Sequence, residues 1–138
     1  MIKKGAGFVI YRNFKDGIKI LGLEGPLDKQ ISLNGKWDIP KGIKEEDEDF
    51  WTCAVRECFE EAGLLIMESD CYTQQPFSDS HLTVWLAKSD HDPTIGPNPK
   101  SGYFEHLSWC WLNPDEAENN CYSWLVPFIK WARKELKC

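Results

Sequence analysis

The chain of 138 residues carries 16 basic and 22 acidic side chains, a formal net charge of −6, and is 42% hydrophobic with seven tryptophans. This length and apolar content predict a single globular domain over residues 1–138 rather than a disordered chain. The acidic balance argues against binding to duplex DNA through a basic face, so an anionic substrate would need another source of positive charge.

Six cysteines are spread along the chain without a Cys-x-x-Cys pair, so neither a thiolate zinc site nor a dithiol redox motif is indicated. The opening MIKKGAGFVIYR has an apolar run too short for a signal peptide. No stretch approaches the roughly 18 apolar residues that a membrane helix needs. We therefore expect reduced thiols in a cytoplasmic protein without a membrane partner.

The first half of the chain shows strand and loop features before a helix. In chain order we expect a strand at 7–11, a strand at 18–24, a loop at 25–36, a short strand at 37–42 and a helix at 49–62. Asp16-Gly17 is typical of a hairpin turn, and Pro40 breaks the short strand. Gly63 directly follows the helix, where glycine commonly ends a helix in a left-handed conformation.

The second half predicts further strands and a C-terminal helix. In chain order we expect an irregular strand at 64–67 and 71–77, a strand at 81–88, a loop at 89–102, a strand at 106–112, a short helix after 113 and an amphipathic helix at 123–137. Pro114 suits the first position of the short helix, and Pro127 is expected in the first turn of the last helix or at a kink. This order predicts an α/β (α+β) protein in which helices pack on a mixed sheet.

The helix at 49–62 gathers Glu57, Glu60 and Glu61 at its C-terminal end. At 100° per residue, these carboxylates occupy an arc of about 100° beside an apolar face that covers roughly half of the circumference. The apolar face consists of Phe50, Trp51, Ala54, Val55, Cys58, Phe59 and Ala62.

Such a cluster is unfavourable, because like charges at these spacings repel and the helix end is itself a negative pole. A divalent cation would reverse both penalties, since Mg²⁺ and Mn²⁺ prefer carboxylate oxygens. A solvated charged face is the alternative, as we expect for the run EEDED at 45–49.

The stretch from Gly42 to Leu64 resembles the signature of the Nudix hydrolases. That signature is Gly, five residues, Glu, seven residues, Arg-Glu, an apolar residue, any residue, Glu-Glu, any residue, Gly and an apolar residue. Its fixed positions are filled here by Gly42, Glu48, Arg56, Glu57, Glu60, Glu61 and Gly63. The resemblance implies a Nudix-like α/β/α sandwich with a loop-helix-loop, and hydrolysis of a nucleoside diphosphate linked to another group.

The resemblance also implies roles for individual residues. The implied ligands of one to three Mg²⁺ or Mn²⁺ ions are Glu57, Glu60, Glu61 and the carbonyl of Gly42. Arg56 would hold Glu48 or a neighbouring carboxylate in place. The metal would neutralise pyrophosphate oxygens and activate water, which replaces the missing basic patch.

Two further stretches resemble the asymmetric diadenosine tetraphosphate hydrolases within this family, WDIPKG at 37–42 and EHLSWCWL at 105–112. They imply that Lys41 reaches a substrate phosphate. Glu105 would be a fourth carboxylate, either a metal ligand or a general base acting through water. His106 either orients a phosphate or is a surface histidine.

Recognition of adenine needs an aromatic platform, because stacking contributes about 1–3 kcal/mol per base. Tyr103, Phe77 and Tyr72 lie in loop-like surroundings and are candidates, with ordinary core packing as the alternative for each. The segment between Cys71 and His81 looks shorter than in the diadenosine enzymes.

The leading expectation is therefore a metal-dependent pyrophosphohydrolase of dinucleoside polyphosphates such as diadenosine tetraphosphate, acting as a monomer or homodimer. The alternative substrates are a 5′-triphosphorylated or capped RNA end, ADP-ribose, a nucleotide sugar and a nucleoside triphosphate. A Nudix-fold binding module that has lost catalysis is a further alternative, although a pure binder has no need of the strained carboxylate cluster.

Overall fold

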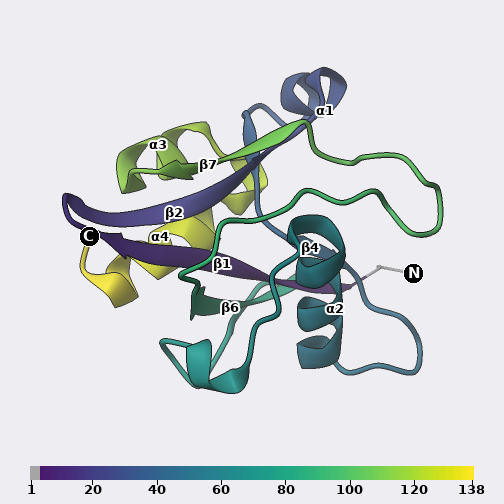
Figure 1. Ribbon diagram of the computed structural model, residues 1–138, viewed down its shortest axis with the longest axis horizontal. Helices are drawn as coiled ribbons and strands as arrows, with labels where there is room; N and C mark the ends of the chain where they lie inside the picture. Colours follow the sequence, from purple (N-terminus) through teal and green to yellow (C-terminus); the bar gives the residue numbers. More distant parts are fainter. Residues whose placement is uncertain (1–3) are drawn as a thin grey trace.

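The computed structural model describes residues 4–138, within which seven strands form one mixed sheet (Figure 1). The strands are β1 (Gly5–Phe14), β2 (Gly17–Glu24), β3 (Trp37–Asp38), β4 (Lys41–Ile43), β5 (Phe77–Ser78), β6 (Leu82–Lys88) and β7 (Ser108–Leu112). The helices are α1 (Leu27–Ser32), α2 (Phe50–Ala62), α3 (Pro114–Asn120) and α4 (Val126–Leu136), with short 3₁₀ turns η1 (Glu68–Asp70) and η2 (Ser123–Leu125). None of the helices in these residues is long and apolar enough to cross a lipid bilayer.

Strand β1 lies at the centre of the sheet. It pairs antiparallel with β2 on one side and parallel with β6 on the other, and its first residues also pair antiparallel with β4. Strands β3 and β7 pair with β2, and β5 pairs with β6. Because Gly7 lies opposite Lys41 and Ala6 opposite Gly42, the short strand β4 is fixed against the start of β1, where α2 also packs.

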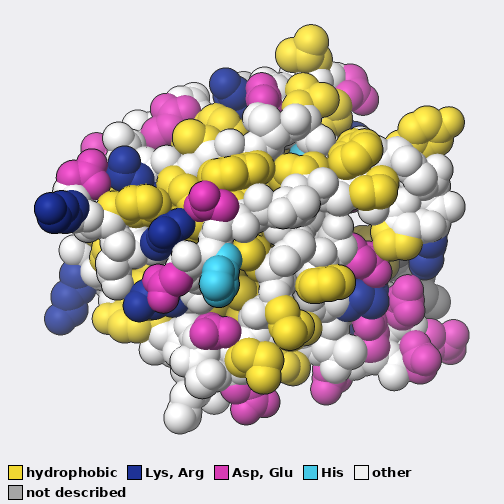
Figure 2. Space-filling view, in the orientation of Figure 1, with side chains coloured by type: hydrophobic (Ala, Val, Ile, Leu, Met, Phe, Trp, Pro, Cys, Tyr) yellow, Lys and Arg dark blue, Asp and Glu magenta, His cyan; other side chains and the backbone are white. Residues whose placement is uncertain are grey.

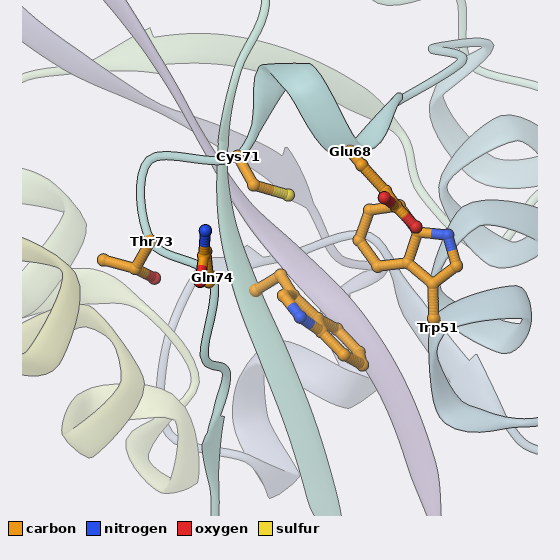
Figure 3. A pocket seen from close by; sticks show the side chains of 6 residues that line it. Trp51, Glu68, Cys71, Thr73 and Gln74 are labelled. Carbon is orange, nitrogen blue, oxygen red and sulfur yellow. The ribbon is translucent and has the colours of Figure 1, made fainter.

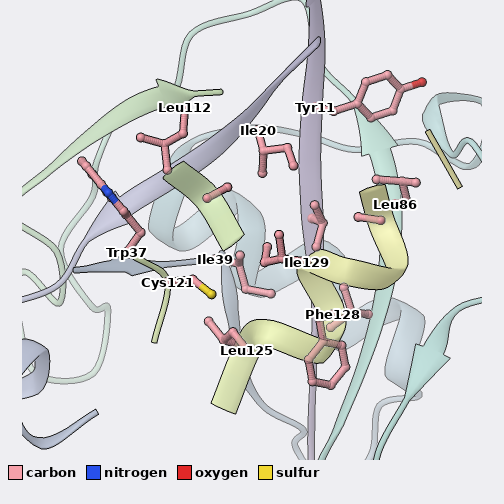
Figure 4. Close-up of a cluster of buried hydrophobic side chains, with 14 of the residues drawn as sticks. Tyr11, Ile20, Trp37, Ile39, Leu86, Leu112, Cys121, Leu125, Phe128 and Ile129 are labelled. Carbon is pink, nitrogen blue, oxygen red and sulfur yellow. The ribbon is translucent and has the colours of Figure 1, made fainter. Parts of the chain in front are cut away.

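Apolar side chains are buried on both faces of the sheet. One cluster joins the sheet to α3 and α4 and includes Ile20, Phe128 and Ile129 (Figure 4). The other joins the sheet to α2 and includes Phe8 and Cys58. In Figure 1, α2 lies on the viewer's side of the sheet and α4 behind it, which is the expected sandwich of helices around a mixed sheet. All six cysteines are free thiols.

Helix α2 begins and ends where the sequence predicts. Asp49 caps its first turn by accepting a hydrogen bond from the N–H of Thr52 at 2.7 Å. Gly63 ends it with φ of 65°, a left-handed conformation that favours glycine. The buried face is shifted from the predicted one, since Phe59 is 56% exposed whereas Glu61 is only 7% exposed.

Three segments differ from their predicted structure. Residues 25–36 contain α1 rather than a loop throughout; this helix has six residues and buries none of them, so no apolar periodicity marks it in the sequence. Residues 64–67 do not pair as a strand. Leu64 and Ile66 are buried in the cluster below α2, which produces a strand-like alternation without strand pairing.

Residues 71–77, expected as an irregular strand, form an isolated bridge at Cys71 and the first residue of β5 at Phe77, with bends and coil between them. The remaining elements agree with expectation. The strands at 81–88 and 106–112 correspond to β6 and β7. Pro114 and Pro127 both lie in the first turn of a helix, where the missing N–H of proline costs no hydrogen bond.

Candidate active site

Residues from three separate parts of the chain line one cavity of about 380 Å³, which we call the acidic cavity. It lies between β4, the C-terminal half of α2 and the loop that precedes β7. The predicted site residues that line it are Lys41, Gly42, Arg56, Glu57, Glu60, Glu61 and Glu105. In Figure 2, acidic side chains gather on the right of the molecule over α2 and the turn before it, with Lys and Arg side chains among them.

Arg56 connects the carboxylates of this cavity. Its Nη2 and Nε donate to Glu48 at 2.6 and 3.0 Å, which makes a bidentate ion pair. Its Nη1 donates to Glu57 at 2.8 Å and lies 3.3 Å from Oε2 of Glu60. These hydrogen bonds from Arg56 lower the pKa of Glu48 to about 2. Arg56 therefore ties the turn before α2 to the carboxylates at its end.

Glu57 and Glu61 are the carboxylates of the site whose charged forms are disfavoured by burial. Burial raises the pKa of both, and raises that of Glu61 well above its ordinary value. One oxygen of Glu61 accepts a hydrogen bond from the backbone N–H of Lys41 at 3.2 Å. A Cβ atom on Gly42 would collide with the carboxyl group of Glu57, so a glycine is required for this close approach. Both carboxylates would gain from a cation placed between them.

The donor set fits a divalent metal ion. The four carboxylates that line both the acidic cavity and a narrow cleft next to it are Glu57, Glu60, Glu61 and Glu105. Within residues 4–138 no three such side chains already converge as a complete metal cluster. Arg56 donates hydrogen bonds to Glu57 and Glu60, and Asn98 donates to Glu105 at 2.9 Å. Metal binding therefore requires these carboxylates to turn away from their present partners.

Asp38 is a site residue that the sequence analysis missed. It lies between Lys41 and His106, with Nζ of Lys41 at 3.1 Å from Oδ1 and Nε2 of His106 at 3.0 Å from Oδ2. His106 is 4% exposed, so its description as a surface histidine is wrong. The only signal in the sequence was the position of Asp38 inside WDIPKG, three residues before Lys41.

The aromatic candidates do not line the acidic cavity. Phe77 stacks on Trp131 with ring centroids 5.6 Å apart and packs on Phe128, within the core on the α4 side of the sheet. Its contacts are therefore those of ordinary packing, the alternative expected for it, and it lies outside the lining of the acidic cavity. Tyr72 packs edge to face against Tyr11. Tyr103 is 78% exposed on the loop before β7 and stays a candidate.

A second cavity of about 450 Å³ lies beside the N-terminal half of α2 (Figure 3). Its lining residues are Trp51, Glu68, Cys71, Thr73, Gln74 and Trp85. It is the larger of the two, but Glu68 is the one charged side chain in this lining. A cavity without several carboxylates or any cation lacks the groups that phosphate chemistry needs.

Comparison with known proteins agrees with this geometry. A family profile described as NUDIX domain matches residues 1–132. The chain is 30% identical over 125 residues to the asymmetrical bis(5′-nucleosyl)-tetraphosphatase of Caenorhabditis elegans, covering 85% of this chain and 83% of that protein.

Solved structures share the fold over nearly the whole chain. A binary complex of a C. elegans Ap4A hydrolase superposes with a TM-score of 0.72 and 26% identity, covering 99% of this chain and 98% of that one. The MutT protein of Methanosarcina mazei Go1 superposes with a TM-score of 0.64 at 19% identity, covering 99% and 96%. The chain therefore belongs to the Nudix hydrolases, an enzyme family that generally uses a divalent metal ion.

Proposed function

We propose that this Nudix hydrolase uses Mg²⁺ or Mn²⁺ to hydrolyse a dinucleoside polyphosphate such as diadenosine tetraphosphate. The observation that carries the proposal is the acidic cavity, whose lining brings Glu57, Glu60, Glu61 and Glu105 together with Lys41. The similarity to the asymmetrical tetraphosphatase of C. elegans supports a substrate with two nucleosides.

In this proposal the carboxylates at the end of α2 hold the metal together with the carbonyl of Gly42. The metal ion supplies charge neutralisation at the phosphate oxygens and a more acidic water. Arg56 keeps the carboxylates near Glu48 in place until the ion binds. Lys41 donates to a phosphate oxygen, since this residue lines the same cavity and carries a positive charge.

Glu105 is our candidate for the general base. Its carboxylate lines the cleft opposite α2, and Asn98 orients one of its oxygens from 2.9 Å. The other oxygen is free to accept a proton from a water molecule in the cleft. A role as a fourth metal ligand is the alternative for Glu105.

The test is a product-resolved substrate screen with Mg²⁺ and with Mn²⁺. The substrates are diadenosine tetraphosphate, ADP-ribose, nucleoside triphosphates and RNA with a 5′-triphosphate. We expect diadenosine tetraphosphate to be cleaved to ATP and AMP. ADP-ribose or an RNA end as the best substrate would replace the dinucleotide assignment, and no turnover of any substrate would favour a binding module.

Glu60→Gln tests the catalytic assignment within the same screen. We expect it to lower turnover by at least about 10–100-fold, the range for losing a group that supports a metal. Glu46→Gln is the matched control, because it removes the same charge from an exposed residue in the turn before α2. Equal turnover in wild type and Glu60→Gln would contradict the assignment.

A further inference from the structure

Asp38, at the end of β3, is a buried carboxylate whose two oxygens are both occupied. It is 6% exposed. Oδ1 accepts a hydrogen bond from the N–H of Ile39 at 2.8 Å, and Oδ2 lies 3.0 Å from Nε2 of His106. The ammonium of Lys41 lies 3.1 Å from Oδ1 and 3.2 Å from Oδ2. Burial alone would raise the pKa of Asp38, but the charge of Lys41 and the hydrogen bond of His106 outweigh it and lower the pKa.

The bond to Asp38 fixes the ring of His106. An ionised carboxylate can only accept, so Nε2 is the nitrogen that carries the shared proton. Nδ1 has no hydrogen-bond partner among residues 4–138, and it is not among their fully buried side-chain nitrogens without a partner, so it keeps some exposure although His106 as a whole is 4% exposed. His106 lines a cavity of about 280 Å³ between α1 and the acidic cavity, which we call the α1-side cavity. The Nδ1 edge of the ring is therefore the part of His106 left to contact a ligand in this cavity.

Lys41 lies where the two cavities meet, since it lines both of them. Its side chain is 19% exposed, and its ammonium group also lies 5.4 Å from the ring centroid of Trp124. Besides Asp38, the carboxylates of Glu61 and Glu105 act on its charge. Without Asp38, the flexible stem of Lys41 would let its ammonium move toward these two carboxylates. That move would remove a cation from the substrate and neutralise candidate metal ligands.

We propose that Asp38 is a positioning residue that aligns Lys41 and His106 on the phosphate chain of the substrate, where the chain passes from the acidic cavity into the α1-side cavity. It also keeps Lys41 apart from Glu61 and Glu105. The identity of the ligand rests on the proposed function, whereas the geometry does not.

The experiment measures binding of a methylene-bridged, non-hydrolysable diadenosine tetraphosphate in the presence of Mg²⁺. Asp38→Asn has nearly the same shape and removes the charge. By calorimetry, we expect it to weaken binding about tenfold, as for the loss of one charge-assisted hydrogen bond. With diadenosine tetraphosphate as substrate, KM should rise more than kcat falls. In a Lys41→Met/His106→Asn background, Asp38→Asn should change affinity by less than about twofold, because the groups that it orients are gone.

Two further measurements separate positioning from stability. Glu116→Gln leaves one carbonyl oxygen where two carboxylate oxygens accept from Nε1 of Trp37 at 3.0 Å and Nδ2 of Asn120 at 2.7 Å. Because Trp37 is the residue before Asp38, this variant should lower the melting temperature without changing affinity. Long-range ¹H–¹⁵N spectra report which ring nitrogen of His106 carries the proton, and the chain has three histidines to assign. We expect an Nε2-protonated ring that changes in Asp38→Asn and responds to the ligand in wild type. The spectra of His106 test the proposal even if the Lys41→Met/His106→Asn variant does not fold.

Unchanged affinity in Asp38→Asn would overturn the proposal, as would an equal loss in Glu116→Gln. Failure of the wild-type protein to bind the probe would overturn it too. Failure of the proposed function gives a different pattern: diadenosine tetraphosphate is not hydrolysed, while the probe still binds and binding still depends on Asp38.

Discussion

At the scale of single residues, the acidic cavity is a balance of buried charges. Arg56 neutralises the carboxylates that it reaches, and Asp38 does the same for Lys41. Glu61 accepts a hydrogen bond from the backbone N–H of Lys41 and is 7% exposed. Burial outweighs the compensating charge of Lys41, so the pKa of Glu61 is raised well above its ordinary value.

Glu61→Gln should stabilise the metal-free protein. The raised pKa of Glu61, caused mainly by burial, means that the folded state holds the proton more tightly than the unfolded state. Its contribution to stability is present below pH 4.5, the ordinary pKa, and is lost as the pH rises through the folded pKa. In chelator at neutral pH, we expect the free energy of unfolding to rise by on the order of 0.5–1 kcal/mol.

Urea unfolding of both proteins across pH measures this effect, and activity with Mg²⁺ should fall in the variant. Glu60→Gln is the comparison: it should change stability little, since its carboxylate is more exposed and lies near Arg56. A Glu61→Gln protein that is less stable than wild type in chelator would contradict the account.

Glu48→Gln tests a carboxylate whose pKa is lowered in the folded state, in contrast to the raised pKa of Glu61. Arg56 lowers the pKa of Glu48 from 4.5 to about 2, so its stabilising contribution is present above pH 4.5 and is lost as the pH falls through about 2. We expect wild type to be more stable than Glu48→Gln at neutral pH, with the difference shrinking in acid. Free energies of unfolding at several pH values measure it, with the exposed Glu46→Gln as control. A difference that does not depend on pH would contradict this assignment.

At the scale of elements, α2 positions the site by its two ends and its buried face. Asp49 starts the helix, Gly63 ends it, and Cys53 and Cys58 are fully buried against the sheet. Local signals in the sequence predicted both ends, because caps act through residues a few positions apart. Helix α1 had no such signal, since it buries no residue and Pro26 makes no side-chain cap.

Asp49→Ala should lower the free energy of unfolding by about 1 kcal/mol, the usual cost of losing an N-terminal cap. The reason is that the N–H of Thr52 loses its acceptor at 2.7 Å. Asp47→Ala removes the same charge from an exposed residue and should change stability little. Chemical denaturation measures both. Turnover should remain near wild type in each, because the carboxylates lie at the other end of α2; equal losses of stability would contradict the capping role.

At the scale of the whole molecule, the sheet separates two packed layers with different tasks. The α2 layer carries the acidic cavity, while the α4 layer contributes apolar packing through Phe128 and Ile129. The sheet then brings β4 and the loop before β7 to the same place as α2. We therefore expect substitutions in the α4 layer to change the stability of the fold more than turnover.

Ile129→Ala should lower the free energy of unfolding by about 2–5 kcal/mol, because it leaves a cavity in a fully buried site. Ile31→Ala makes the same change at a side chain that is 82% exposed and should have little effect. At a temperature where both are folded, kcat should match wild type. A large loss of kcat in folded Ile129→Ala would show that the two layers are coupled.

The sequence by itself determined the family signature, the ends of α2 and the set of carboxylates, because these depend on fixed spacings and local hydrogen bonds. Only the tertiary structure decided which face of α2 is buried, since β4 covers Glu61 and leaves Phe59 exposed. It also placed Phe77 against Trp131 and brought Asp38 to His106, 68 residues apart. Such contacts depend on how strands pair, which no local pattern encodes.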